Sequence, residues 1–185
     1  MIKALPLTTI DEICAVCKFV ASSTGTFVEL GTRFGGTSSL IARLFPERAV
    51  LTINIATEHG DAFAGLDNVT FIQANSQAGP MSTMSIGVLF VDAEHTPGAV
   101  QVDISRWSPQ VEPGGFVIVH DSVLRDELSV SVGGVQLSHK NAAGEDETGY
   151  PEIGEIAKHI LSDGWTLVDT VDSALIFHKE FWNET

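Results

Sequence analysis

The chain has 185 residues, of which 44% are hydrophobic and 18% charged, and this composition predicts one globular domain spanning residues 1–185. Its formal net charge of −14 argues against non-specific binding to nucleic acid, because such binding needs Lys and Arg to neutralise the phosphates. No apolar run reaches the roughly 18 residues of a membrane span, and the N-terminal residues lack the apolar core of a signal peptide. We therefore expect a cytoplasmic protein with no membrane segment, which is either a monomer or a homo-oligomer.

The first predicted element is an amphipathic helix over residues 9–22. Thr9 and Glu12 have the spacing of a capping box, in which each side chain satisfies a backbone N–H group of the other residue. The only two cysteines, Cys14 and Cys17, lie in this helix with C-x-x-C spacing, which can indicate a redox or zinc site. No strand precedes them and no second Cys/His pair completes a zinc site, so we expect both cysteines to pack in the core.

After this helix, predicted strands and helices alternate along the chain. Strands are expected at 26–30, 49–54, 68–74, 85–92 and 116–120, with helices at 37–45, at 57–63 and from Pro97 onward, and a turn at 112–115. Residues 85–92 form a continuous apolar run, which is typical of a strand buried on both faces. The alternation predicts an α/β fold with a doubly wound, mostly parallel sheet.

The C-terminal part departs from this alternation. Residues 122–150 are polar and Gly-rich, which predicts a long loop whose flanking His139 and Tyr150 could face a substrate. The chain then closes with a helix that starts at Pro151, followed by strands at 165–171 and 174–179. A tight turn joins these two strands, so we expect an antiparallel hairpin.

Polar side chains collect where the predicted strands end. Right-handed crossovers place the carboxyl ends of all parallel strands at one edge of the sheet, where the ligands of doubly wound proteins bind. The polar residues at these ends are Glu29, Asn54, Asn75, Asp92, His120 and Asp121. Their convergence predicts a ligand site at that edge.

The strand over residues 26–30 leads into a glycine-rich turn with glycines at 31, 35 and 36, and Thr37 opens the following helix. The turn lacks the G-x-G-x-x-G spacing of a dinucleotide fingerprint, which disfavours a nicotinamide oxidoreductase, and it lacks the Lys of a P-loop. Glycines let the backbone approach a ligand closely, and a helix N-terminus suits a carboxylate or phosphate. The turn is therefore expected to cradle a ligand.

Three segments resemble motifs of the class I S-adenosylmethionine-dependent methyltransferases, and are closest to the small bacterial O-methyltransferases and cephalosporin-hydroxylase-like proteins. The first is the E-x-G-x-x-x-G pattern within residues 28–37. The second, residues 90–95, resembles the motif hydrophobic-D-G-x-H. The third, residues 111–121, resembles the motif L-x-P-G-G-x-hydrophobic-x-x-H-D. The resemblance extends over residues 26–180. It implies a seven-stranded Rossmann-like fold, S-adenosylmethionine as cofactor and O-methylation of a small-molecule substrate.

The resemblance also implies which residues contact the cofactor. They lie in the turn and at the strand ends: Glu29, Gly31, Thr32, Arg33, Gly35, Thr37, Asn54, Asn75 and Asp92. Glu29 would help to hold the methionine amino group. Asn54 stands where the family usually has an acid that grips the ribose hydroxyls, and Asn75 where it often has Asp near the adenine. The two amides indicate a weaker hold, a specialised pocket or a degenerate site, or they are simply turn formers.

The candidate catalytic residues are Asp92, His95, His120 and Asp121. In metal-dependent relatives, side chains at these strand ends hold a divalent ion that activates the acceptor hydroxyl, which implies Asp92, His120 and Asp121 as ligands. His120 leaves the identity of the metal open, because imidazole suits Zn²⁺, Mn²⁺ or Fe better than Mg²⁺ or Ca²⁺. The metal-free alternative is a general base at His95 or His120.

Two simpler hypotheses stand beside this one. The aspartates can cap the segments that follow them, with His95 packed locally. The whole chain can also be a non-catalytic binding or regulatory module that keeps the methyltransferase fold.

Overall fold

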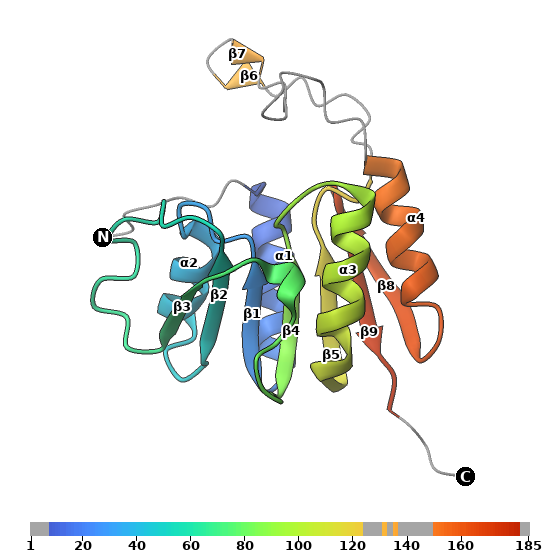
Figure 1. Ribbon diagram of the computed structural model, residues 1–185, viewed down its shortest axis with the longest axis horizontal. Helices are drawn as coiled ribbons and strands as arrows, with labels where there is room; N and C mark the ends of the chain where they lie inside the picture. The colour runs from blue at the N-terminus through green and yellow to red at the C-terminus, as the bar shows by residue number, and fades with distance from the viewer. Residues whose placement is uncertain (1–7, 124–130, 133–134, 137–149, 182–185) are drawn as a thin grey trace.

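The computed structural model describes residues 8–123, 131–132, 135–136 and 150–181, and its core is one seven-stranded sheet (Figure 1). The strands lie in the order β3 (Val69–Gln73), β2 (Val50–Asn54), β1 (Thr26–Leu30), β4 (Ile86–Val91), β5 (Val111–Val119), β9 (Ala174–Lys179) and β8 (Trp165–Val171). The first five strands are parallel, and β9 runs antiparallel to both β5 and β8. The predicted doubly wound sheet and its closing hairpin are confirmed.

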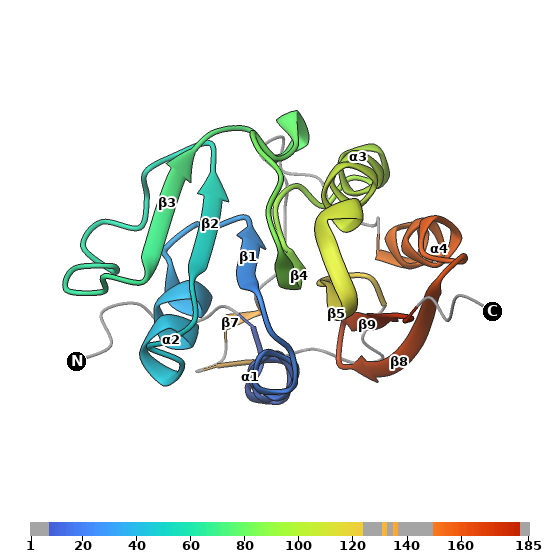
Figure 2. The ribbon, with the colours of Figure 1, turned by 90° about the horizontal axis from the view of Figure 1, so that it is seen from below.

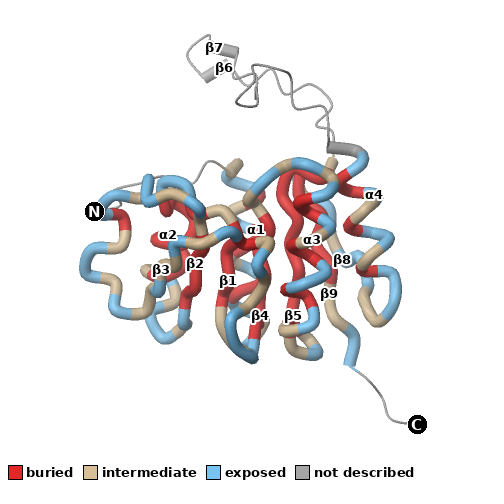
Figure 3. The backbone as a smooth tube through the Cα atoms, viewed as in Figure 1, coloured by how far each residue is buried: buried red, intermediate tan, exposed pale blue. Residues whose placement is uncertain are grey.

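Helices cover both faces of the sheet, as Figure 2 shows. On one face α1 (Ile10–Ser22) and α2 (Gly36–Leu44) pack on side chains such as Phe27 and Phe90. On the other face α3 (Pro97–Trp107) and α4 (Tyr150–Ile160) pack on side chains such as Val28 and Leu89. Figure 3 shows the resulting burial of the central strands. No helix within the described residues is long and apolar enough to cross a membrane.

The N-terminal helix begins as the sequence predicts. The backbone N–H of Glu12 donates to Thr9 Oγ1 over 3.2 Å, and the N–H of Thr9 donates to Glu12 Oε2 over 2.9 Å. The expectation that both cysteines pack in the core is wrong for Cys14, which is exposed, while Cys17 is half-buried. The buried stripe of α1 consists of Glu12, Ala15, Val16, Phe19 and Val20, so position 14 faces away from the sheet.

Two local predictions are wrong. The helix expected at residues 57–63 is replaced by consecutive turns over residues 58–65, in which Gly60 has a φ of 54° that a right-handed helix does not allow. Residues 112–115 belong to β5 instead of a separate turn, and the ladder between β4 and β5 absorbs them as a register shift between Ile86 and Val88. Most of the predicted loop, including His139, lies outside the described residues, apart from the short pair β6 (Ser131–Val132) and β7 (Val135–Gln136).

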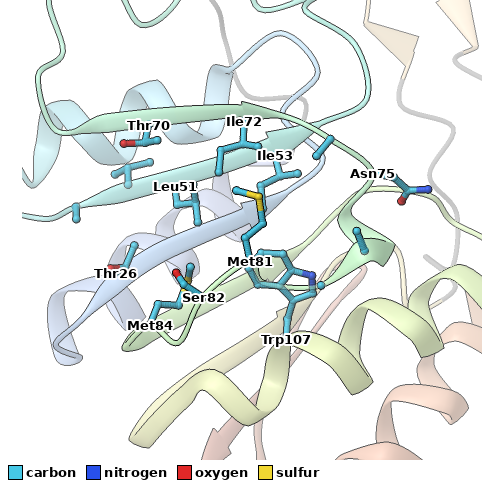
Figure 4. A pocket seen from close by; sticks show the side chains of 15 residues that line it. Thr26, Leu51, Ile53, Thr70, Ile72, Asn75, Met81, Ser82, Met84 and Trp107 are labelled. Atoms are coloured by element: carbon cyan, nitrogen blue, oxygen red, sulfur yellow. The ribbon is translucent and has the colours of Figure 1, made fainter.

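An apolar pocket of about 370 Å³ lies on the α3 side of β2 and β3, where no helix among the described residues covers the sheet (Figures 2 and 4). Its walls include Leu51, Ile53 and Ile72 from the strands, Met81 and Met84 from the segment before β4, and Trp107 from α3. None of the lining residues carries a charge.

Candidate active site

The glycine-rich turn lies against the end of β4. Gly31 has a φ of 102°, and a Cβ atom at this position would stand only 2.0 Å from the carbonyl oxygen of Asp92. Hydrogen bonds join the strand ends at this level, from the N–H of Asp92 to Leu30 O over 2.8 Å and from the N–H of Gly31 to Ile53 O over 2.9 Å. Only glycine allows this close approach of the turn to Asp92.

The turn continues into α2 with left-handed backbone at Arg33, with a φ of 42°, and at Gly35, with a φ of 75°. Gly35 is the N-cap of α2, and no side chain caps the helix there, so the amide end of α2 is suited to an anionic group. A Cβ atom at Gly35 would meet the ring of Phe63 at 2.8 Å. The space beside Gly35 is therefore filled by protein, while Thr32 and Thr37 are buried and Arg33 is exposed.

Glu29 is turned into the protein interior. Its Oε2 accepts hydrogen bonds from Ser38 Oγ over 2.5 Å and from Thr52 Oγ1 over 2.6 Å, and the side chain is buried. Burial raises the pKa of Glu29 to about 8, against the lowering effect of these two hydrogen bonds. A neutral carboxyl beneath the turn supports α2 and β2, which differs from the ionised contact to a methionine amino group that the family resemblance implies.

The two asparagines end their strands in different ways. Asn54 donates its amide hydrogen to the carbonyl oxygen of Ala56 over 3.0 Å and is half-buried. Asn75 is the N-cap of the short 3₁₀ helix η1 (Ser76–Ala78) and accepts the N–H of Gln77 on Oδ1 over 2.9 Å. Both amides therefore take part in local turns. Each side chain still has an oxygen lone pair and an amide hydrogen with which it could hydrogen-bond a ligand.

The structure brings the four candidate catalytic residues into one cluster. One ligand atom from each of Asp92, His95, His120 and Asp121 lies within 4.8 Å of the others. Asp92 Oδ1 lies 3.2 Å from His95 Nε2 and 3.0 Å from His120 Nδ1. Asp121 Oδ2 lies 3.7 Å from His95 Nδ1 and 3.4 Å from His120 Nδ1. Each carboxylate is thus shared by both imidazoles.

The ends of β4 and β5 bring this cluster together. Val91 pairs with Val119, and the N–H of His120 donates to Val91 O over 3.0 Å, so the residues that follow both strands enter the same space. Asp121 has a φ of 51°, a left-handed conformation that Asp tolerates better than most residues. Such a backbone conformation is common at functional sites.

Sequence reasoning missed a fifth charged member of the cluster, Glu12. Its Oε2 lies 3.3 Å from His120 Nε2, on the far side of the ring from Asp92. Its Oε1 accepts the N–H of Ser173 over 3.0 Å and the hydroxyl of Ser173 over 2.7 Å. The signal that could have revealed it is an acidic residue at a position that shares the apolar stripe of α1.

Charge pairing sets the protonation of the cluster. Burial alone would raise the pKa of Asp92, but the charges and hydrogen bonds of His120 and His95 hold it well below its usual range. The same opposing effects lower the pKa of Glu12 and Asp121. Burial lowers the pKa of both imidazoles, yet the surrounding carboxylates outweigh it and raise the pKa of His95 and, more strongly, of His120. The three carboxylates therefore favour the protonated form of the imidazoles, and the imidazoles favour the ionised form of the carboxylates.

The side chains of the cluster differ in their exposure to solvent. The side chain of Glu12 is 1% exposed and that of His120 9%, whereas Asp92 is 21% and His95 19% exposed. Asp92 and His95 are therefore partly open to solvent, whereas Glu12 and His120 lie deeper in the protein. Asp92, His95, His120 and Asp121, which include the three predicted ligands, also fit a divalent ion, because ligand atoms about 2.0–2.6 Å from one ion lie within roughly 4–5 Å of each other.

The sheet order and the site at its carboxyl edge define a class I methyltransferase fold. Residues 28–122, just over half of the chain, match a family model described as a methyltransferase domain. The chain belongs to the S-adenosylmethionine-dependent methyltransferases of class I. Membership of this family makes it an enzyme and supports S-adenosylmethionine-dependent methylation over the alternative of a non-catalytic module.

Solved structures with the same fold are distant in sequence. A Staphylococcus aureus protein provisionally assigned as a caffeoyl-CoA O-methyltransferase is 13% identical, with a TM-score of 0.70 over 96% of this chain and 86% of that one. The O-methyltransferase NovP is 14% identical, with a TM-score of 0.66 over 97% of this chain and 84% of NovP. A Burkholderia thailandensis 1,6-didemethyltoxoflavin-N1-methyltransferase, solved with its substrate and S-adenosylhomocysteine, is 15% identical, with a TM-score of 0.63 over 92% and 77%. No curated protein matches the chain significantly.

Proposed function

We propose that this protein methylates a hydroxyl oxygen of a small molecule at the cluster of Asp92, His95, His120 and Asp121. The observation that carries the proposal is the contact between the glycine-rich turn and the cluster of acids and histidines. The glycine-rich turn expected to cradle the cofactor touches Asp92 through Gly31, and Asp92 in turn contacts both imidazoles. Cofactor and acceptor would therefore meet at Asp92.

S-adenosylmethionine, when bound, supplies an electrophilic methyl group and leaves as S-adenosylhomocysteine. The chain fits it through the Gly31 turn, the uncapped amide end of α2 and the half-buried amide of Asn54. The neighbouring structure that contains S-adenosylhomocysteine and the two O-methyltransferase neighbours support the choice of cofactor and of an oxygen acceptor.

The residues of the cluster have separate tasks in this proposal. Asp92 holds the ring of His95 in place through the 3.2 Å contact between Asp92 Oδ1 and His95 Nε2. His95, the more exposed imidazole, takes the hydroxyl proton as the new C–O bond forms. His120 stays protonated, stabilises Asp92 and Asp121 as carboxylates and keeps them in place. The glycine turn closes the opposite side of the site.

A divalent ion is a further option at the same residues. Asp92 and Asp121 would hold it together with His95 or His120, because one ligand atom of each of the four residues lies within 4.8 Å of the others. Such an ion would lower the pKa of the acceptor hydroxyl. Two carboxylates and one imidazole form a mixed oxygen and nitrogen set that suits Mn²⁺, Fe²⁺ or Zn²⁺.

Calorimetry with S-adenosylhomocysteine, followed by a methyl-transfer assay on a panel of phenols, catechols, sugars and amines, tests the proposal. The assay should be run with chelator and with Mg²⁺, Mn²⁺ and Zn²⁺ in turn. Asp92→Asn and His95→Gln should each lower turnover at least about 100-fold, the range expected for a general base. Glu94→Gln, an exposed acid in the same loop, is the matched control and should retain turnover. Transfer to amines alone, or no binding of S-adenosylhomocysteine, would overturn the proposal.

A further inference from the structure

Glu12 is buried far beyond what a helix cap requires. A capping box needs only one oxygen of the Glu carboxylate, which accepts the N–H of the cap residue. Here Oε2 accepts that N–H from Thr9 and also faces His120, while Oε1 accepts two hydrogen bonds from Ser173. The side chain is 1% exposed, and a buried charge is costly unless it is fully paired. The contacts to His120 and Ser173 therefore call for a function other than capping.

The geometry around His120 indicates this function. The two ring nitrogens of His120 lie between carboxylates, with Nδ1 at 3.0 Å from Asp92 Oδ1 and Nε2 at 3.3 Å from Glu12 Oε2. The χ2 torsion of histidine is broad, so packing alone does not fix the direction of the ring nitrogens. Of these two carboxylates, Glu12 is the one removed from the open side of the site, because its side chain is buried whereas Asp92 is partly exposed.

We propose that Glu12 is a positioning residue that receives the Nε2–H of His120 and thereby keeps Nδ1 directed at Asp92 and Asp121. The inference rests on the proposed function of that cluster and adds to it a residue from the N-terminal helix. Glu12 touches neither the acceptor nor the cofactor and acts only through His120. It has the relation to His120 that an orienting carboxylate has to the histidine of a catalytic triad.

Ser173 holds Glu12 in place from the other end of the chain. Its hydroxyl lies 2.7 Å from Glu12 Oε1 and 3.2 Å from Asp121 Oδ1, so the turn between β8 and β9 supports both acids. Glu12 thus links α1, β5 and the β8–β9 turn through hydrogen bonds to Thr9, His120 and Ser173. Because Ser173 holds the Glu12 carboxylate, the Nε2–H of His120 has a hydrogen-bond acceptor at a defined position.

Glu12→Gln is the direct test, because both carboxylate oxygens accept hydrogen bonds and an amide has only one oxygen. Whichever way the amide turns, it presents N–H groups either to His120 or to Ser173. The matched control is Asp11→Asn, which removes one charge from the same first turn of α1 at an exposed position. Both substitutions remove one negative charge from the first turn of α1, and only Glu12→Gln also changes the contacts to His120 and Ser173.

The readout that does not depend on turnover is the ring N–H proton of His120, observed by NMR on ¹⁵N-histidine-labelled protein and assigned with His120→Gln. The parent and Asp11→Asn should show a downfield, slowly exchanging Nε2–H resonance. In Glu12→Gln this resonance should move upfield and exchange faster, because an amide oxygen is a weaker acceptor than a carboxylate. With an acceptor in hand, Glu12→Gln should lower kcat about 10- to 100-fold, as loss of an orienting partner does in metal sites, with KM for S-adenosylmethionine unchanged.

An Nε2–H resonance with the same chemical shift and exchange rate in Glu12→Gln as in the parent, its absence from the parent, or an unchanged kcat would overturn the assignment. If Glu12→Gln does not fold, Ser173→Ala replaces it, and unchanged exchange of the Nε2–H there would equally count against Glu12. Thr9→Ala removes the cap but keeps the carboxylate, so it should lower only the unfolding temperature. A parent that gives the resonance but methylates no acceptor would refute the proposed function and leave the placement of Glu12 intact.

Discussion

Replacing Gly31 with Ala tests the contact that joins the glycine turn to Asp92. The added Cβ would stand 2.0 Å from the Asp92 carbonyl oxygen and 2.5 Å from its carbonyl carbon, both of which are backbone atoms. It would also have to adopt a φ of 102°, which L-residues rarely do. The turn and the end of β4 must therefore separate in the variant.

The cost follows from these two effects. A non-glycine residue in such a conformation costs about 1–3 kcal/mol, and forcing an extra carbon into a packed site about 1–3 kcal/mol. We expect Gly31→Ala to lose about 2–6 kcal/mol of unfolding free energy, which for a chain of this length lowers the unfolding temperature by about 4–24 °C. Gly60→Ala is the matched control, since Gly60 has a φ of 54° but no atom within 4 Å of the added Cβ.

Urea denaturation of the three proteins without ligand measures both costs. Gly60→Ala should lose about 1 kcal/mol or less, because alanine also reduces the entropy of the unfolded chain. The difference between the two variants isolates the collision with Asp92. Equal midpoints for Gly31→Ala and Gly60→Ala would refute the close approach of the turn to β4, and with it the meeting of cofactor and acceptor at Asp92.

Three further predictions address charge and cofactor affinity. The pKa of Glu29 rises from 4.5 to about 8 on folding, so its contribution to stability is complete below about pH 4.5 and is lost as the pH rises through about 8. Between pH 5 and 9 the parent should therefore lose on the order of a few kcal/mol of unfolding free energy relative to Glu29→Gln, and parallel stability profiles in denaturant would contradict this. Because the pKa of His95 is raised above 6.5 and a base must be neutral, turnover without metal should increase through the pH range above that value. His95→Gln should show a flat pH profile, and a parent rate that falls over the same range would exclude His95 as the base. Asn54→Asp should tighten S-adenosylhomocysteine several-fold, worth about 1 kcal/mol, and calorimetry that shows no gain would place the ribose elsewhere.

Local patterns sufficed to predict most of the fold. The continuous apolar run of β4 and the cap at Thr9 are encoded within a few residues, so their elements appear where the sequence predicts them. The helix expected at residues 57–63 failed because one glycine with positive φ outweighs a weak helical pattern. The glycines at 114 and 115 predicted a turn, yet pairing of β5 with β4 incorporates them into the strand.

The sequence predicts the members of the cluster that follow strand ends, and it does not reveal the member that packing between distant segments brings in. Asp92, His120 and Asp121 follow β4 and β5, and neighbouring parallel strands necessarily bring their ends together. Glu12 is 108 residues from His120 and 161 from Ser173, and its local sequence is fully explained as a helix cap. Likewise the hydrogen bond from Thr52 to Glu29 depends on the pairing of β1 with β2, which brings the two residues together.

The long-range contacts of Glu12 make the centre depend on both ends of the chain. The carboxylate of Glu12 comes from the first helix, and its two donors at Ser173 come from the final hairpin, which itself pairs with β5 next to His120. A chain that lacked this hairpin would leave Glu12 with fewer donors, and a buried carboxylate without them becomes costly. The last two strands therefore close the sheet and also stabilise the carboxylate behind His120. The C-terminal hairpin and the cluster around His120 are therefore joined through this one side chain.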